Sequence, residues 1–163
     1  MRRTFTTMLL AGVAAAAFAG PASAQSGTTV KIGVLSDMSS LYADLAGPGS
    51  IIAAKMAIED FGAAAKGIKV EVVGADHQNK ADVGANIARQ WYDRDGVDLI
   101  VDVPNSAVAL AVNEVTKDKN KVFLNSGAAS SDLTGSKCSP NTIHWAYDTW
   151  MLANGTGSAI VKT

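Results

Sequence analysis

The chain has 163 residues, 48% of them hydrophobic, which is enough for one domain with a hydrophobic core. Its 14 Lys and Arg residues stand against 15 Asp and Glu residues, and this balance excludes the basic surface with which proteins bind nucleic acids or anionic membranes. One cysteine and two histidines also exclude a zinc site built from clustered Cys and His residues.

The N-terminus has the pattern of a secretory signal peptide. The basic pair Arg2-Arg3 precedes an apolar run from Met8 to Phe18, and Ala22-Ser23-Ala24 has the small residues of a cleavage site. The apolar run is too short to span a bilayer core of about 30 Å. We therefore predict a cleaved signal over residues 1–24 and a mature exported chain from Gln25. An uncleaved membrane anchor is the weaker alternative, and the residue directly after the cleavage site is Gln25 rather than a cysteine that could carry a lipid.

Strands and helices alternate along the rest of the chain. Apolar runs and period-two patterns predict strands over residues 30–35, 68–73, 97–103, 121–124 and 142–145. Apolar stripes at helical spacing predict helices over residues 50–61, 82–93, 106–117 and from 149 onward. This alternation predicts an α/β fold with a Rossmann-like parallel sheet that helices cover on both faces.

Several residues have predicted roles within these elements. Asp82 is a candidate N-cap of the second helix, and Asn105 or Ser106 is a candidate N-cap of the third. The run Leu99-Ile100-Val101 predicts a strand that is buried on both faces. The last predicted helix has no stop signal before Thr163, which is typical of a sequence that has been cut short.

Polar loops follow the predicted strands and define a candidate binding site. The carboxyl ends of parallel strands open onto one edge of the sheet, where open α/β sheets bind their ligands. The loops at this edge cover residues 36–49, 76–80, 104–106 and 125–131. In the last of them every side chain is small, so that the backbone can approach a ligand closely. Two of the loops lead into helix N-termini, whose free amides favour a carboxylate.

Aromatic residues near these loops are candidate walls of the site. Tyr42, Tyr147 and Trp150 could contact the apolar part of a ligand, and Trp145 lies beside them in the sequence. The alternative role is packing in the hydrophobic core. We expect core packing for Trp145 and weigh the two roles equally for Tyr42 and Tyr147.

Catalytic motifs are scarce in the chain. Gly47-Pro48-Gly49 lacks the third small residue of a dinucleotide fingerprint and lies far from its strand, and there is no P-loop or nucleophile elbow. Asp76 and His77 are a possible acid/base pair, but adjacent residues seldom face one another, so we expect His77 to make turn hydrogen bonds. We expect His144 to be a packed or bridging residue. The sequence thus predicts no enzyme, no cofactor and no metal site.

The order of these motifs resembles the periplasmic solute-binding receptors of ABC importers, in the branch that binds leucine, isoleucine and valine. The resemblance covers residues 29–163. It rests on Lys31–Ser36, Ala53–Ala57, Glu59-Asp60, Trp91-Tyr92-Asp93, Val97–Ile100, Asn105-Ser106, Gly127-Ala128-Ala129 and Asp132-Leu133-Thr134.

The resemblance implies a type I periplasmic binding protein fold, in which two Rossmann-like lobes joined by three crossings close on the ligand. Residues 25–163 would form the first lobe, ending after a first crossing near Ile143–Asp148, with the second lobe missing. In amino-acid-binding members, a Ser after the third strand and an Ala-x-Thr after the fourth hold the ligand's carboxylate and ammonium. Ser106 matches the first. The second falls on residues 127–129, without a hydroxyl, or on residues 128–130, with Ser130 in place of Thr.

The predicted function is therefore an extracytoplasmic receptor that binds a small carboxylate-bearing solute and delivers it to an ABC permease. The solute would be a branched-chain or other hydrophobic amino acid, or an aromatic acid, because the segment from Cys138 to Trp150 is similar to relatives associated with aromatic acids. We expect a monomer when full length. The predicted ligand-binding residues are Tyr42, Asn105, Ser106, Ser126, Gly127, Ala128, Ala129, Ser130, Tyr147 and Asp148. The alternatives are a secreted α/β enzyme and a ligand-sensing domain of the same fold.

Overall fold

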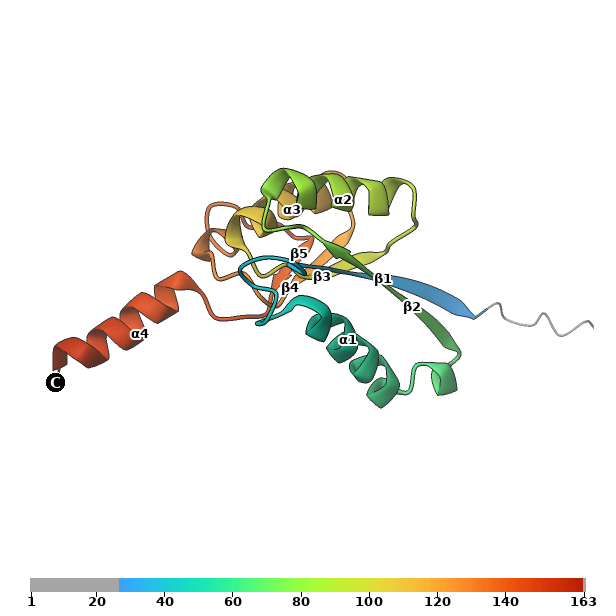
Figure 1. Cartoon of the computed structure of the whole chain (residues 1–163), viewed down its shortest axis with the longest axis horizontal. Coiled ribbons are helices and arrows are strands. Elements are labelled where there is room, and N and C mark those ends of the chain that lie inside the picture. Colours follow the sequence, from blue (N-terminus) through green and yellow to red (C-terminus); the bar gives the residue numbers. More distant parts are fainter. Residues whose placement is uncertain (1–26, 163) are drawn as a thin grey trace, which may run out of the picture.

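The computed structural model describes residues 27–162, and the predicted signal peptide, residues 1–24, lies outside them. Five parallel strands form one sheet in the order β2-β1-β3-β4-β5 (Figure 1). The strands are β1 (Thr28–Ser36), β2 (Ile68–Asp76), β3 (Leu99–Asp102), β4 (Val122–Asn125) and β5 (Thr142–His144). The predicted Rossmann-like α/β fold is confirmed. The strand order reverses direction between β1 and β3, which makes the carboxyl ends of these two strands a topological switch point.

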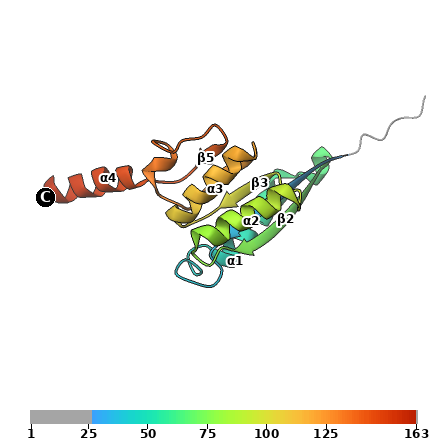
Figure 2. The same ribbon diagram turned by 90° about the horizontal axis from the view of Figure 1, so that it is seen from above.

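Four α-helices and two short 3₁₀ helices accompany the sheet. They are α1 (Gly47–Phe61), η1 (Ala64–Lys66), α2 (Ala81–Asp93), α3 (Ser106–Asp118), η2 (Ser131–Leu133) and α4 (Thr149–Lys162). Helices α2 and α3 lie side by side on one face of the sheet, and α1 lies on the other (Figures 1 and 2). Helix α4 projects away from the sheet in both views. None of the helices within residues 27–162 is long and apolar enough to cross a membrane.

The hydrophobic core lies between the sheet and helices α2 and α3. Ile100 and Phe123 are neighbours in register on β3 and β4, and both are fully buried. Trp91 of α2 packs over Gly33 of β1, where a Cβ atom would lie 2.4 Å from Cζ3 of the indole. The glycine therefore makes room for the tryptophan. Burial raises the pKa of Tyr92 to about 12, although its hydroxyl is hydrogen-bonded within the core.

The opposite face is covered by α1 alone. Ile100 is buried as predicted, but Leu99 and Val101 point to this face and are only partly buried. The prediction that β3 is buried on both faces is therefore correct for one face only. Side chains of α1 and of strands β1 to β4 line an apolar hollow of about 600 Å³ on this side.

Local contacts explain where helices α2 and α3 begin. Asn105 caps α3 as predicted, since its Oδ1 accepts a hydrogen bond from the amide of Val108 at 3.0 Å. The prediction that Asp82 caps α2 is wrong, because the helix already begins at Ala81. Gln78 and Asn79 both have positive φ angles, and the amide of Lys80 donates to the carbonyl of His77 at 2.9 Å. This tight turn starts α2 before Asp82 is reached.

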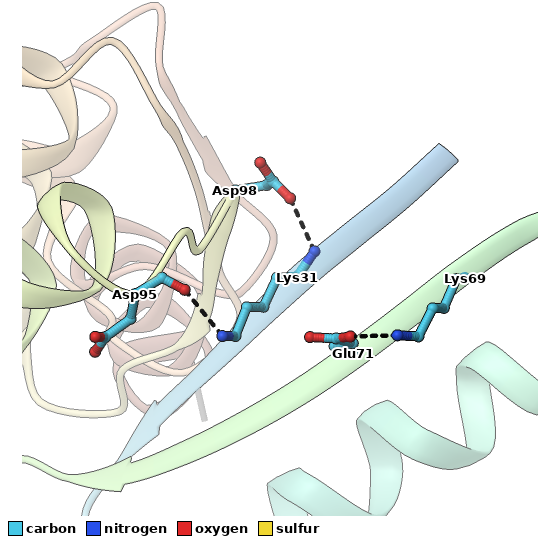
Figure 3. A network of polar contacts seen from close by, with 5 residues as sticks. All are labelled: Lys31, Lys69, Glu71, Asp95 and Asp98. Atoms are coloured by element: carbon cyan, nitrogen blue, oxygen red, sulfur yellow. Dashed lines mark hydrogen bonds and ion pairs between the residues drawn. The ribbon is translucent and has the colours of Figure 1, made fainter. Parts of the chain in front are cut away.

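A polar network fixes the amino-terminal part of β1 (Figure 3). The backbone amide of Lys31 donates to Oδ2 of Asp98 at 2.8 Å, and its Nζ donates to the carbonyl of Asp95 at 2.9 Å. On β2, Lys69 and Glu71 form an exposed ion pair of 2.7 Å, which lowers the pKa of Glu71. The two contacts of Lys31 tie β1 to the segment that enters β3.

Candidate ligand-binding site

The carboxyl ends of all five strands form one row. Ser36 is in register with Asp76, Asp102 with Asn125, and Asn125 with His144. The loops that follow β1 to β4 therefore start at the same edge of the sheet, as the sequence predicts. This edge is the candidate ligand-binding site.

The loop after β1 is organised by the buried carboxylate of Asp37. Oδ1 accepts from the amide of Ser40 at 3.0 Å, while Oδ2 accepts from the Ser40 hydroxyl at 2.6 Å and from the amide of Tyr42 at 2.9 Å. Burial raises the pKa of Asp37, but the hydrogen bonds outweigh it and leave this pKa below its ordinary value. The loop thereby holds Tyr42, which is partly buried, at the edge of the sheet.

Asp76 joins this first loop to the loop after β2. Its Oδ1 accepts from the amides of Met38 and Gln78 at 3.0 and 2.7 Å, and its Oδ2 accepts from the Ser39 hydroxyl at 2.6 Å. Burial again raises the pKa of Asp76, and these bonds lower it below its ordinary value. Both carboxylate oxygens are occupied by the fold.

His77 is fully buried and does not pair with Asp76. Its Nδ1 accepts a hydrogen bond from the amide of Asn79 at 3.0 Å, which confirms the predicted turn hydrogen bond. Burial lowers the pKa of His77, and the negative charges of Asp37, Asp76 and Asp102 offset part of this effect. The acid/base pair that the enzyme alternative requires is not formed among the described residues.

The turn after β3 presents the N-terminus of α3. Asn105 caps the helix and donates from Nδ2 to Oδ1 of Asn79 at 2.5 Å, which links the loops after β2 and β3. Ser106 is the first residue of α3 and is partly exposed. The backbone amides of Ser106 and Ala107 have no hydrogen-bond acceptor within residues 27–162. Such free amides, at the positive end of a helix dipole, are suited to an anionic group.

The loop after β4 lies directly over the end of β3. A Cβ atom on Gly127 would lie 2.7 Å from Cα of Pro104 and 3.1 Å from Oδ1 of Asp102. Ala128 is buried, and its amide donates to Oδ1 of Asn125 at 3.0 Å. Its carbonyl accepts from Nε2 of His144 at 2.7 Å, which confirms the predicted bridging role of His144.

The small residues of this loop therefore divide into two groups. Gly127 and Ala128 face the protein and set the height of the loop above the sheet. Ser126 is exposed, and Ala129 and Ser130 are partly exposed, so these three remain open at the edge. The Ser130 hydroxyl accepts from the amide of Asp132 at 3.3 Å, and that of Ser126 has no partner among the described residues.

The segment after β5 is tied to the same loop before it enters α4. The amide of Thr149 donates to the carbonyl of Ala129 at 2.7 Å, and the Ser131 and Thr149 hydroxyls are 2.7 Å apart. Asp148 caps α4, with its Oδ1 accepting from the amide of Met151 at 2.6 Å. Tyr147 is exposed beside this cap.

The prediction that Trp145 packs in the core is wrong. Its side chain is 77% exposed, and Trp150 is exposed as well. The tryptophans flank the start of α4, and this helix projects away from the sheet rather than packing on it (Figures 1 and 2). Cys138 is also exposed, with no disulfide partner in the described part of the chain.

The chemistry that this edge offers is hydroxyl, amide and aromatic. Residues 27–162 contain no group of three or more His, Cys, Asp or Glu side chains that could hold a metal ion. Comparison with known families decides the assignment, because the profile described as "Periplasmic binding protein" matches residues 29–163. The chain belongs to the periplasmic binding protein family.

Solved structures support the assignment. A periplasmic binding protein from Burkholderia mallei is 55% identical, with a TM-score of 0.78, and a branched-chain amino acid ABC transporter periplasmic ligand-binding protein from Burkholderia xenovorans is 46% identical, with a TM-score of 0.76. Each alignment covers 82% of this chain and 36% of the other, so the chain spans about a third of the length of these relatives. A solute-binding protein from Rhodopseudomonas palustris, in complex with benzoate, shares the fold at 20% identity and a TM-score of 0.74, over 82% of this chain and 37% of that one. No curated protein matches the chain.

The architecture of this periplasmic binding protein thus matches a lobe of the type I fold, and the predicted resemblance is confirmed. Members of the family are solute-binding components of transport systems rather than enzymes.

One buried residue of the binding protein's candidate site is not indicated by the sequence pattern. Asp102 ends β3 within a run of apolar residues, and its carboxylate lies beneath the loop after β4. The signal that could have identified it is a charged residue at the end of an otherwise apolar, buried strand.

Proposed function

We propose that this protein is the solute receptor of an ABC importer and that it binds a small solute through a carboxylate group. The observation that carries the proposal is the N-terminus of α3. There the amides of Ser106 and Ala107 have no acceptor among the described residues, next to the Ser106 hydroxyl. A carboxylate would accept hydrogen bonds from these groups and would be stabilised by the helix dipole.

The two ligand classes that we propose both carry this group. The relative from Burkholderia xenovorans is named for branched-chain amino acids, and the fold neighbour from Rhodopseudomonas palustris is in complex with benzoate. An amino acid and an aromatic acid both combine a carboxylate with an apolar body. Tyr42 and Tyr147, which are partly and largely accessible, would contact that body.

The remaining predicted site residues have different parts in the proposal. Ser126, Ala129 and Ser130 stay open at the edge and would contact the polar end of the solute. The other four, Asn105, Gly127, Ala128 and Asp148, would hold the binding groups in place, since their contacts in the described structure are with the protein itself.

The wider setting is proposed on the same basis. The family is periplasmic, and we propose that residues 1–24 are the cleaved signal that exports the chain. We also propose that residues 25–163 form the first lobe, that a permease in the membrane receives the solute, and that the full-length protein is a monomer.

Isothermal titration calorimetry of the purified full-length protein tests the proposal. We expect saturable 1:1 binding of at least one hydrophobic amino acid or aromatic acid. Ser106→Ala should weaken it by roughly 3- to 10-fold, the loss of one hydrogen bond to a charged group. Ser158→Ala, on the exposed surface of α4, is the matched control and should leave the affinity unchanged. Turnover of a bound acid would support the enzyme alternative, and the absence of binding by all acids of both classes would contradict the receptor.

A further inference from the structure

The carboxylate of Asp102 lies buried at the floor of the candidate site. Only 7% of the residue is exposed, and its Oδ1 is 3.1 Å from the position that a Cβ atom on Gly127 would take. Asp102 therefore lies beneath the loop of residues 126–130. Together with Ser126 it is also among the polar residues that line the apolar hollow.

This carboxylate makes no hydrogen bond or ion pair in the part of the chain that the structure describes, although its charge acts on the buried imidazole of His77. Its buried Oδ2 atom makes no hydrogen bond within residues 27–162. The ion pairs in this range join Lys69 to Glu71, Lys119 to Asp93 and Lys121 to Asp98, so none of them involves Asp102. A buried ionised carboxylate is costly unless a hydrogen-bond donor or a cation compensates it.

The backbone at Asp102 is also unusual. Asp102 and Val103 have φ angles of 80° and 61°, in the left-handed region that a β-branched residue such as valine rarely adopts. Strained conformations of this kind gather at functional sites, where the surrounding structure holds them. Both residues are buried between their neighbours, so the position of the carboxylate is fixed.

A second unpartnered group lies beside it. Asn125 is in register with Asp102 on the neighbouring strand and is fully buried. Its Oδ1 accepts from the amide of Ala128, whereas its Nδ2 has no acceptor among the described residues. The floor of the loop thus carries a carboxylate acceptor next to an amide donor, neither of which is used by a hydrogen bond within residues 27–162.

We propose that Asp102 is a specificity-determining residue, which favours a ligand that brings an ammonium or another N–H group to this part of the site and disfavours a ligand whose only polar group is a carboxylate. The inference rests on the proposed receptor function. Charges interact strongly at short range in a buried site, so a negative charge under the ligand loop attracts a cation and repels an anion. An α-amino acid carries both groups. Its carboxylate would bind at the N-terminus of α3, and its ammonium would lie toward Asp102.

The matched probes are L-leucine and 4-methylpentanoate, which share the apolar chain and the carboxylate and differ in the ammonium group. Calorimetry on the full-length protein would compare both, with benzoate as a third probe. We expect the wild type to prefer leucine. Asp102→Asn keeps the shape of the side chain and removes its charge, and it should reduce that preference by about 10-fold or more. Asp118→Asn removes an exposed charge at the far end of α3 and should leave the preference unchanged.

The N–H group that compensates the carboxylate of Asp102 could instead come from another part of a longer protein chain, and not from the ligand. In that case Asp102→Asn would lower the melting temperature of the ligand-free protein and leave the preference for leucine intact, which overturns the inference. A wild type that binds 4-methylpentanoate or benzoate as tightly as leucine also overturns it, while the receptor function stands. If Asp102→Asn does not fold, the preference of the wild type decides alone. If the protein binds none of the three probes or any other acid, the receptor function fails and the inference fails with it.

Discussion

His144 donates a hydrogen bond from Nε2 to the carbonyl oxygen of Ala128 at 2.7 Å, and this bond joins β5 to the loop after β4. The carbonyl belongs to the buried residue Ala128, so water could not easily replace His144 as its donor if that side chain were removed. The position of the proposed binding groups therefore depends on a residue that need not touch the ligand.

Replacing this donor should loosen the loop. We expect His144→Ala to destabilise the protein by about 1–3 kcal/mol, the cost of an unsatisfied buried carbonyl, and to weaken ligand binding as well. Urea denaturation followed by circular dichroism gives the first quantity and calorimetry the second. His144→Gln can still reach the carbonyl with an amide donor and serves as the control. Equal stability of His144→Ala and the wild type would show that the bond contributes nothing.

Gly127 should be intolerant of a side chain. In Gly127→Ala the new Cβ would meet the backbone of Pro104 at 2.7 Å, so the loop must move away from β3. We expect a loss of about 1–3 kcal/mol in stability, as is usual for overpacked sites, and weaker ligand binding. Gly155→Ala is the matched control, because nothing lies within 4 Å of its Cβ position in α4. The control should be neutral or slightly stabilising, since alanine favours a helix. Similar melting temperatures for both variants would contradict the prediction.

The residues of the loop after β4 also show how far sequence reasoning reaches. A strand that runs into seven small or polar residues predicts a loop at the sheet edge, and the parallel sheet places it there. The sequence does not tell which small residues face inward. Gly127 and Ala128 are oriented by contacts with Pro104, Asn125 and His144. These three residues lie at or just after the ends of three different strands, so the contacts depend on how the strands are placed in the sheet.

Two further differences have the same origin. Trp145 is a large apolar residue of the kind that often lies in a core, but its burial depends on which elements pack over it. It is exposed, and the nearby helix α4 projects away from the sheet (Figure 2). Asp102 is the last residue of β3 and follows three apolar residues, so the sequence pattern shows it only as the end of a strand. Its position beneath Gly127 becomes evident only when β4 is placed beside β3. Local pattern predicts the elements, whereas these side chains are placed by tertiary packing.

The stability should depend on pH through His77. Burial lowers the pKa of its imidazole below the ordinary value of 6.5, and nearby carboxylates offset this only in part. Between the two pKa values the unfolded chain binds a proton that the folded chain does not, so this contribution to stability is complete above 6.5 and falls as the pH falls. We expect the urea midpoint to decrease from about pH 7 to about pH 5. His77→Asn keeps an acceptor for the Asn79 amide and does not titrate, so its midpoint should change less. Parallel pH profiles would assign the effect to other groups.

Asn105 allows its two roles to be separated by two substitutions. Its Oδ1 caps α3, and the cap lies next to the free amides that we propose to bind the ligand's carboxylate. Asn105→Ala should destabilise the protein by about 1 kcal/mol, the usual value of a lost N-cap. Asn105→Asp keeps an equally good cap, so its cost in stability should be smaller, although the bond to Asn79 loses its donor. The new carboxylate, however, places a negative charge beside the proposed anion site and neutralises the helix dipole that favours the ligand. Asn105→Asp should therefore bind a carboxylate ligand more weakly than Asn105→Ala does, although it is the more stable of the two.

Thermal melts and calorimetry on both variants give the comparison. If affinity follows stability instead, the N-terminus of α3 supports the fold and does not bind the carboxylate.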